Sequence, residues 1–175
     1  KELDTIRQLE DAGAGGVVLY SLFEEQIDFE SLEMSHYLEY GSESFAEALS
    51  YFPEPGQFVR GPEEYLEHIR RTKQAVDFPV IASLNACSPG GWTDYAAKIE
   101  QAGADGLELN VYFLPTNLQQ PVAEIESVYT DIISEVRRAV KIPIAFKMHP
   151  FFTSIGRMAR LAEEAGADGL VLFNR

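Results

Sequence analysis

Cysteine, positive charge and long apolar runs are scarce in this sequence, and each shortage excludes a class of protein. A single cysteine among 175 residues cannot form an internal disulfide, so a cytoplasmic protein is expected. Lys and Arg number 14 against 28 Asp and Glu, a formal net charge of −14. Such a surface repels phosphate backbones and anionic lipid, so we expect neither nucleic acid nor a membrane as a partner. No apolar run approaches the roughly 20 residues of a membrane span.

Several catalytic and ligand-binding motifs are also missing from the sequence. It contains no Gly-x-Gly-x-x-Gly, no Gly-Lys-Ser/Thr phosphate loop and no Gly-x-Ser-x-Gly elbow. No grouping of His, Cys and Asp has the spacing of a metal site, so no metal is expected. A hydrophobic content of 46% suits one globular domain over residues 1–175. The chain begins without Met and stops at Arg175 as a strand finishes, which indicates a piece of a longer protein.

A repeat organises what is present. The segment Leu9-Glu-Asp-Ala-Gly-Ala-Gly-Gly-Val-Val-Leu19 returns as Ile99-Glu-Gln-Ala-Gly-Ala-Asp-Gly-Leu-Glu-Leu109 and again as Ala162-Glu-Glu-Ala-Gly-Ala-Asp-Gly-Leu-Val-Leu172. Each copy reads as the end of an amphipathic helix, a tight turn and an apolar strand. The glycine of each Ala-Gly-Ala fits a left-handed residue that closes a helix without a Cβ penalty.

Strands of a second type follow a proline, in Phe78-Pro-Val-Ile-Ala-Ser-Leu84 and Ile142-Pro-Ile-Ala-Phe-Lys147. Helices alternating with strands that are apolar throughout predict βαβ crossovers and a parallel sheet. The predicted strands are Gly16–Tyr20, Val80–Leu84, Gly106–Val111, Ile144–Met148 and Gly169–Phe173, and the predicted helices are Leu3–Ala12, Pro62–Ala75, Thr93–Ala102, Ile125–Val140 and Ile155–Ala165.

Polar residues stand at the carboxyl end of every predicted strand, and this favours a (β/α)₈ barrel over an open doubly wound sheet. A ring of polar groups around one mouth is typical of a barrel. Five strands cannot close a ring of eight, so we predict a partial TIM barrel of about five parallel strands. The strand-end residues are Ser21, Asn85, Asn110, Lys147 and Asn174.

A long segment separates the first two predicted strands. Residues 22–61 exceed a plain crossover and are predicted to form a helical insertion, with Ser42 or Ser44 as an N-cap and Phe52-Pro-Glu-Pro-Gly56 as a turn. Such an insertion suits a lid over the mouth, a contact in a homo-oligomer, or a helical excursion without function.

Lys147 is the leading candidate for chemistry, because it ends the apolar run Pro143-Ile-Ala-Phe-Lys-Met-His-Pro150 at the place where α/β proteins bind ligands. A lysine there can form a Schiff base, hold a phosphate, or place positive charge beside a flavin. A side chain that only extends from the barrel rim is the structural alternative.

Carboxamides at three strand ends are the second feature. Asn85, Asn110 and Asn174 each offer a donor and an acceptor, which suits the edge of a pyrimidine or isoalloxazine ring. Each alone is also explained as a loop former or cap. Glu108 is interpreted as pointing away from this mouth, toward a helix or loop.

Two further residues carry reactive groups near the predicted strand ends. Cys87 is interpreted as a small buried thiol rather than a base. The ordinary pKa of histidine makes His149 an acid–base candidate, although a histidine before proline is often only a hydrogen-bonded loop residue.

The ordered set of strand ends resembles the dihydroorotate dehydrogenases, in particular their bacterial dihydroorotate dehydrogenase-like branch. Glu108-Leu-Asn110, then Phe146-Lys147, then Leu172-Phe-Asn174 carry the likeness, together with Val80-Ile-Ala-Ser-Leu-Asn85 and Ser21-Leu-Phe-Glu-Glu25. It runs from the first helix to the end of the chain. The resemblance implies an FMN-dependent (β/α)₈ barrel that oxidises dihydroorotate to orotate in pyrimidine biosynthesis.

The resemblance also implies roles for individual residues. Lys147, as the catalytic residue, would lie against the pyrimidine edge of FMN, and Ser83 or Asn85 would line the FMN pocket. Asn110 would contact FMN and a small, dihydroorotate-like substrate, and Asn174 would bind substrate or FMN.

Three departures from the family pattern bear on activity. The Glu-Leu-Asn strand continues as Val111-Tyr-Phe-Leu-Pro-Thr-Asn117, where the family carries a Cys or Ser base. Tyr20-Ser21 stands where a lysine is expected, and the FMN phosphate site would fall beyond Arg175. An aldolase-like or phosphate-sugar barrel with Lys147 as a Schiff base, and a catalytically silent barrel subunit, therefore stay open as alternatives.

Overall fold

The computed structural model describes residues 2–23, 62–86, 92–111, 113 and 115–174. The predicted helical insertion therefore lies outside the described residues from position 24 onward, as do its caps and Cys87. Its predicted start at Leu22 is wrong by two residues, because the first strand continues to Phe23. No helix in the described ranges is both long and apolar enough to cross a membrane.

Helices and strands alternate along the chain as predicted, with boundaries within three residues of those expected. The strands are β1 (Val17–Phe23), β2 (Val80–Ala86), β3 (Gly106–Val111), β4 (Ile144–Met148) and β5 (Gly169–Leu172), and the helices are α1 (Glu2–Asp11), α3 (Pro62–Lys73), α4 (Trp92–Gln101), α5 (Val122–Ala139) and α6 (Ile155–Glu164).

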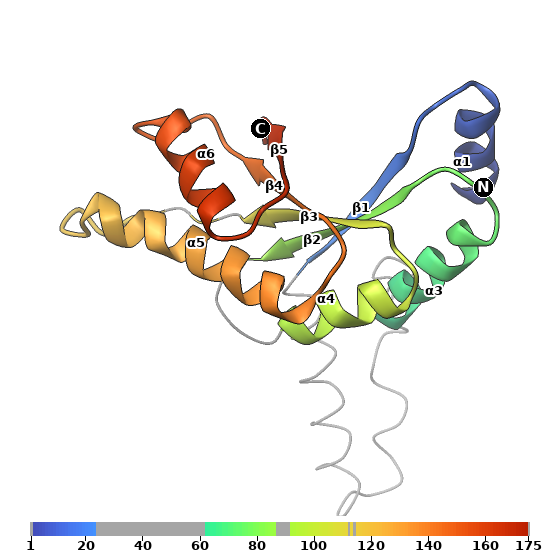
Figure 1. Ribbon diagram of the computed structural model, residues 1–175, viewed down its shortest axis with the longest axis horizontal. Helices are drawn as coiled ribbons and strands as arrows, with labels where there is room; N and C mark the ends of the chain where they lie inside the picture. The colour runs from blue at the N-terminus through green and yellow to red at the C-terminus, as the bar shows by residue number, and fades with distance from the viewer. Residues whose placement is uncertain (1, 24–61, 87–91, 112, 114, 175) are drawn as a thin grey trace, which may run out of the picture.

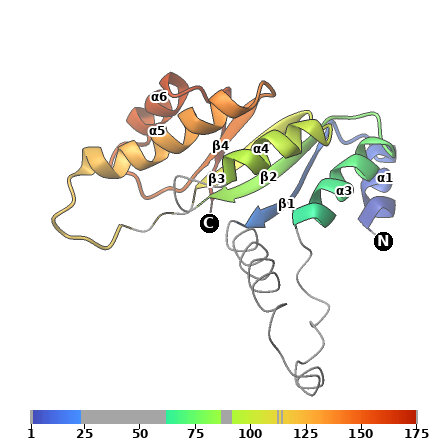
Figure 2. The same ribbon diagram turned by 90° about the horizontal axis from the view of Figure 1, so that it is seen from below.

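The five strands form one parallel sheet in the order β1-β2-β3-β4-β5. A doubly wound sheet reverses its strand order near the middle, whereas a barrel adds each strand beside the previous one. Helices α3, α4 and α5 lie along one side of the sheet, and α1 and α6 flank its two ends (Figures 1 and 2). The fold is therefore a partial (β/α)₈ barrel, as the sequence predicts.

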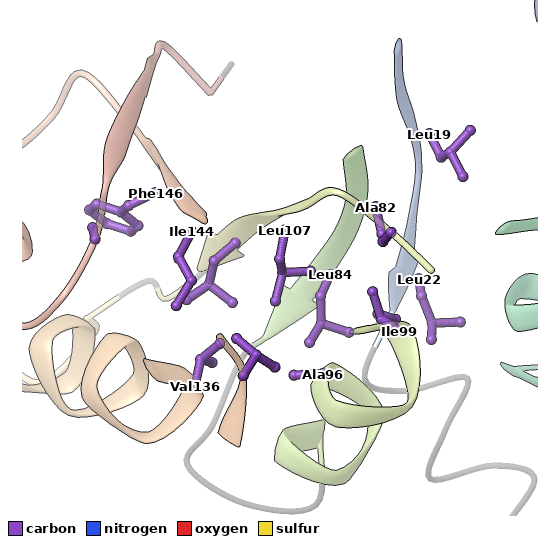
Figure 3. Close-up of a cluster of buried hydrophobic side chains, with 14 of the residues drawn as sticks. Leu19, Leu22, Ala82, Leu84, Ala96, Ile99, Leu107, Val136, Ile144 and Phe146 are labelled. Carbon is purple, nitrogen blue, oxygen red and sulfur yellow. The ribbon is translucent and has the colours of Figure 1, made fainter. Parts of the chain in front are cut away.

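The hydrophobic core lies between the sheet and this layer of helices. Alternate strand residues such as Leu84, Leu107 and Ile144 are fully buried, and they meet Ile99 of α4 and Val136 of α5 (Figure 3). Burying one such side chain contributes roughly 1.5–3 kcal/mol. The apolar residues of each strand point toward the helices. The residues that alternate with them therefore point to the opposite face of the sheet.

The repeated Ala-Gly-Ala turn has the same geometry in all three copies. Gly13, Gly103 and Gly166 have φ values of 89°, 98° and 109°, the left-handed region predicted for them. In the second copy the amides of Gly103 and Ala104 donate to the carbonyls of Glu100 and Ile99. This is the Schellman pattern, which satisfies the last carbonyls of a helix and turns the chain into the next strand.

Carboxylates of the repeat fix the amino ends of the strands. Glu100 accepts hydrogen bonds from the backbone amides of Lys141 and Ile142, just before β4, and Glu10 does the same for the two amides before β2. Asp105 accepts from the amide of Val80 at 2.7 Å. Each acid ties one βα unit to the start of another, so the repeat sets the register of the sheet.

Asp105 also forms an ion pair with Lys73, with 2.6 Å between Nζ and Oδ2. Burial alone would raise the pKa of Asp105, but the hydrogen bonds from Lys73 and Val80 and the lysine charge outweigh it. The pKa of Asp105 therefore lies below its ordinary value of 3.8. Asp168, in the next copy of the repeat, has the same arrangement two βα units later, with Arg137 and the amide of Ile144.

Replacing Asp105 with Asn tests this link. It removes the charge but keeps an oxygen for the Val80 amide, and we expect a loss of about 1 kcal/mol in the free energy of unfolding at pH 7, because the pair is partly exposed. A pKa lowered by folding means that this stabilisation is present above pH 3.8 and is lost as pH falls through the folded-state pKa. Denaturant titrations at pH 7 and at about pH 3 measure it. Asp131→Asn, on the exposed face of α5, is the control. A deficit that does not change with pH would contradict the assignment.

Candidate functional site

Polar residues of β2, β3 and β4 lie on the face of the sheet opposite the helix-packed core. Asn85, Asn110 and Lys147 occupy one row of the parallel register, and Ser83 and Glu108 occupy the row two residues earlier. Since register partners in a parallel sheet leave the same face, these side chains share a surface. The structure therefore brings Lys147 together with two of the three predicted carboxamides.

The third carboxamide joins the row from beyond the end of β5. The Nδ2 group of Asn174 donates to Oδ1 of Asn110 at 2.7 Å, and the Asn174 backbone amide donates to the carbonyl of Met148 at 2.6 Å. Asn174 is thereby held next to the row although β5 ends at Leu172.

The predicted orientation of Glu108 toward a helix or loop is wrong, because its side chain faces the mouth. Its Oε1 accepts from Ser83 Oγ at 3.0 Å and lies 3.4 Å from Nζ of Lys147. Side chains alternate along β3, so Glu108 lies on the same face as Asn110, two residues away. The i, i+2 spacing in the sequence therefore indicates the correct face. Glu108 is 5% exposed, which makes Lys147 its compensating charge.

Ser83 continues this network toward β1. Its hydroxyl lies 2.8 Å from that of Ser21, so a chain of polar contacts crosses β1, β2, β3 and β4. Ser21 lies two residues inside the strand and not at its end, because β1 continues to Phe23. The register of β1 against β2 shifts between Val18 and Ser21.

Tyr65 of α3 compensates for this irregularity. Its hydroxyl accepts from the Ser83 amide at 2.9 Å and donates to the Ser83 carbonyl at 3.2 Å. Burial raises the pKa of Tyr65 far above its ordinary value, so it remains a neutral hydroxyl that can make both bonds. The backbone that carries Ser83 and Asn85 is thus held by a helix as well as by the sheet.

Asn85 is the unusual member of the row. Its side chain is 7% exposed, and within the described part of the chain its Oδ1 has no hydrogen-bond partner. A buried acceptor without a donor costs roughly 1–3 kcal/mol. An N–H group of a ligand at the mouth would satisfy it, and Lys147, 27% exposed, would supply a positive donor beside it.

His149 lies on the other side of the strand end from the row. Its Nε2 is 3.1 Å from the hydroxyl of Tyr129, and its ring stacks on Phe152. Burial lowers the pKa of His149, which favours the neutral ring. Sequence reasoning found neither Tyr129 nor these ring contacts, because they arise from the packing of α5 against two loops. No cluster of three metal-binding side chains occurs among the described residues.

Comparison with curated proteins gives relatives named dihydroorotate dehydrogenase, of the B (NAD(+)) and A (fumarate) types. The chain is 34% identical over 116 residues to the catalytic subunit of dihydroorotate dehydrogenase B (NAD(+)) of Methanothermobacter thermautotrophicus, a match that covers 65% of this chain and 37% of the relative. The same subunit of Thermoplasma volcanium is 30% identical over 97% of the chain and 53% of its own length. That of Pyrococcus abyssi is 31% identical over 98% and 54%. The chain thus spans about half the length of the relatives that it matches throughout.

Comparison with solved structures supports the barrel. Dihydrodipicolinate synthase of Oceanobacillus iheyensis matches 99% of this chain and 46% of its own with a TM-score of 0.58 at 12% identity. Phosphonopyruvate hydrolase matches 95% of this chain and 53% of its own with a TM-score of 0.55 at 20% identity. At these identities the likeness concerns the fold alone. No protein-family model matches the chain.

The ion pair in the mouth can be tested by stability. Replacing Lys147 with Met leaves the buried Glu108 carboxylate without its cation, and we expect a loss of about 2 kcal/mol in the free energy of unfolding. The double variant Lys147→Met, Glu108→Gln should be more stable than Lys147→Met alone, because no charge is then stranded. Denaturant titration of the four proteins of the cycle measures the coupling. Strictly additive effects would show that the two side chains do not interact.

Proposed function

We propose that this chain forms part of an FMN-dependent oxidoreductase of the dihydroorotate dehydrogenase type. One observation carries the proposal: a buried, unpartnered carboxamide oxygen stands in the same row as a second carboxamide and a lysine at the carboxyl edge of a barrel sheet. The relatives named dihydroorotate dehydrogenase, at about 30% identity, support the same class.

The residues of the row fit the ring of FMN. The pyrimidine edge of a flavin offers one N–H donor flanked by carbonyl acceptors. Asn85 Oδ1 supplies the missing acceptor for such an N–H, and the Lys147 ammonium and carboxamide Nδ2 groups supply donors for the carbonyls. When bound, FMN supplies the capacity to take two electrons from a carbon–carbon bond of the substrate.

The chain's own residues would orient and charge this site. Glu108 positions the amine of Lys147 through the ion pair, and the positive charge of Lys147 would favour the reduced, anionic form of the cofactor. Asn110, held by Asn174, would present its amide to both cofactor and substrate. These roles require no covalent bond to the protein.

The observations support the proposed class of enzyme, an FMN-dependent oxidoreductase, more strongly than they support a particular substrate. From Val111, the last residue of β3, the chain continues as Val111-Tyr-Phe-Leu-Pro-Thr-Asn117, which has no cysteine or serine to remove a proton. We therefore place oxidation or reduction of a CH–CH bond within the proposal and treat dihydroorotate as the first substrate to assay.

A barrel that forms a Schiff base on Lys147 is the rival hypothesis. Imine formation needs a neutral amine with a free lone pair, whereas here the amine lies 3.4 Å from a buried carboxylate. Treatment with borohydride and a carbonyl compound such as pyruvate should therefore leave Lys147 unmodified, as mass spectrometry of the digested protein would show. A reduced adduct on Lys147 would favour the rival.

FMN binding tests the proposal directly. The full-length protein should purify yellow or take up added FMN, and Asn85→Leu should weaken FMN binding by about tenfold or more, because the ligand N–H loses its acceptor. The same variant should not destabilise the FMN-free protein, since it removes an unsatisfied buried oxygen.

Lys147→Met should also weaken FMN binding, while Lys141→Met, a lysine on an exposed position before β4, serves as the matched control. The visible absorbance of the flavin and the quenching of FMN fluorescence follow the titration. A colourless full-length protein that leaves added FMN fluorescence unquenched would end the proposal.

A further inference from the structure

A cavity of about 350 Å³ lies beside the polar row, at the carboxyl ends of β3 and β4. It is built by the segment after β3, by the first half of α5 and by the segment after β4. Five of its eleven lining residues, all from these three segments, carry aromatic rings. They are Phe113, Tyr129, His149, Phe151 and Phe152.

The rings hold one another in fixed orientations. His149 and Phe152 stack with centroids 4.0 Å apart and an angle of 15°, and Tyr129 meets Phe152 edge to face at 5.0 Å. Phe113 approaches Tyr129 at 6.4 Å and 75°. Stacked and edge-to-face pairs each contribute about 0.5–1.5 kcal/mol beyond area burial. The cavity is thus a preformed aromatic one.

A chain of hydrogen bonds fixes the polar atoms of this wall as neutral groups. The Phe151 amide donates to His149 Nδ1 at 3.1 Å, so in the neutral ring Nε2 carries the proton and donates to the Tyr129 hydroxyl. That hydroxyl donates to the Phe113 carbonyl at 3.1 Å. Burial lowers the pKa of His149 and raises the pKa of Tyr129 to about 12, which agrees with two uncharged groups.

The cavity offers no free positive charge among its described lining residues. Glu126 is the one carboxylate in the wall, and Arg157 Nε contacts both of its oxygens, at 3.0 and 3.3 Å. Arg157 itself is outside the lining. An anion entering the cavity would lose its hydration without gaining a cation, which is unfavourable.

Asn174 joins this cavity to the polar row. Its side chain lines the cavity and at the same time donates to Asn110. A molecule whose reacting atoms lie at the row can therefore extend past Asn174 into the aromatic cavity. Ligand sites typically combine such an apolar volume, of about 300–1,000 Å³, with a few polar groups.

We propose that the cavity binds an uncharged aromatic group of the substrate. This rests on the proposed function, and it makes the substrate larger and less polar than a small dicarbonyl anion. A volume of about 350 Å³ has room for one or two rings, whereas a carboxylate finds no cationic partner among the described lining residues. Specificity would then come from the aromatic wall and reactivity from the row.

Two dyes of nearly the same shape test the charge preference. The neutral N-phenyl-1-naphthylamine should bind the full-length protein with enhanced fluorescence, and the anionic 1-anilinonaphthalene-8-sulfonate should bind roughly tenfold more weakly or worse. Val122 lies at the rim, 54% exposed, so Val122→Trp should fill the entrance without disturbing the core. This variant should weaken the neutral dye by about tenfold or more, and Val122→Ala should not.

The outcomes separate this inference from the proposed function. Equal binding of the two dyes, or no loss with Val122→Trp, would overturn the inference even if the protein carries FMN. Binding of the neutral dye that Val122→Trp blocks would support an aromatic site even in a protein that proves to bind no FMN. With FMN bound, Val122→Trp should raise the KM of an aryl-substituted substrate and leave FMN content unchanged.

Discussion

The contact between the buried Glu108 carboxylate and the Lys147 amine is the interaction on which the rest of the site depends. A carboxylate in the middle of a fully buried strand is stable only with a cation and a hydrogen-bond donor, and Lys147 and Ser83 supply them. Because these partners come from β4 and β2, the Glu108 carboxylate links three neighbouring strands. It also fixes the amine beneath the carboxamide row, where a ligand would meet it.

Carboxylates also organise the opposite edge of the sheet, where the strands begin, but there they stabilise the backbone. Four carboxylates accept hydrogen bonds from backbone amides at the starts of strands, so they contribute to stability and register and lie away from the polar row. They are Glu10, Glu100, Asp105 and Asp168. Acidic residues are thus divided between two ends of one sheet. This division agrees with barrels in general, in which one face carries stability and the other carries chemistry.

The sequence predicts most of the fold because its signals are local. Apolar strands, proline starts and the glycines of three Ala-Gly-Ala turns each depend on a few residues, and all appear where expected. The common face of Asn85, Asn110 and Lys147 also follows from strand ends in register. The prediction for Glu108 is wrong, although its i, i+2 spacing to Asn110 places both side chains on one face of β3. The aromatic cavity could not be predicted from the sequence, because its rings come from three segments whose contacts depend on helix packing.

The central claim, that three carboxamides and Lys147 line one ligand site, can be observed atom by atom. The sequence holds four asparagines. Asn85, Asn110 and Asn174 lie together at the polar row, while Asn117 lies on an exposed segment and accepts a hydrogen bond from the Gln119 amide. The side-chain amide resonances of all four can be followed by ¹H–¹⁵N NMR while FMN is added to the full-length protein. The account predicts that the signals of Asn85, Asn110 and Asn174 shift together and that Asn117 stays in place. Saturating FMN that moves none of the three, or moves Asn117 equally, would contradict it.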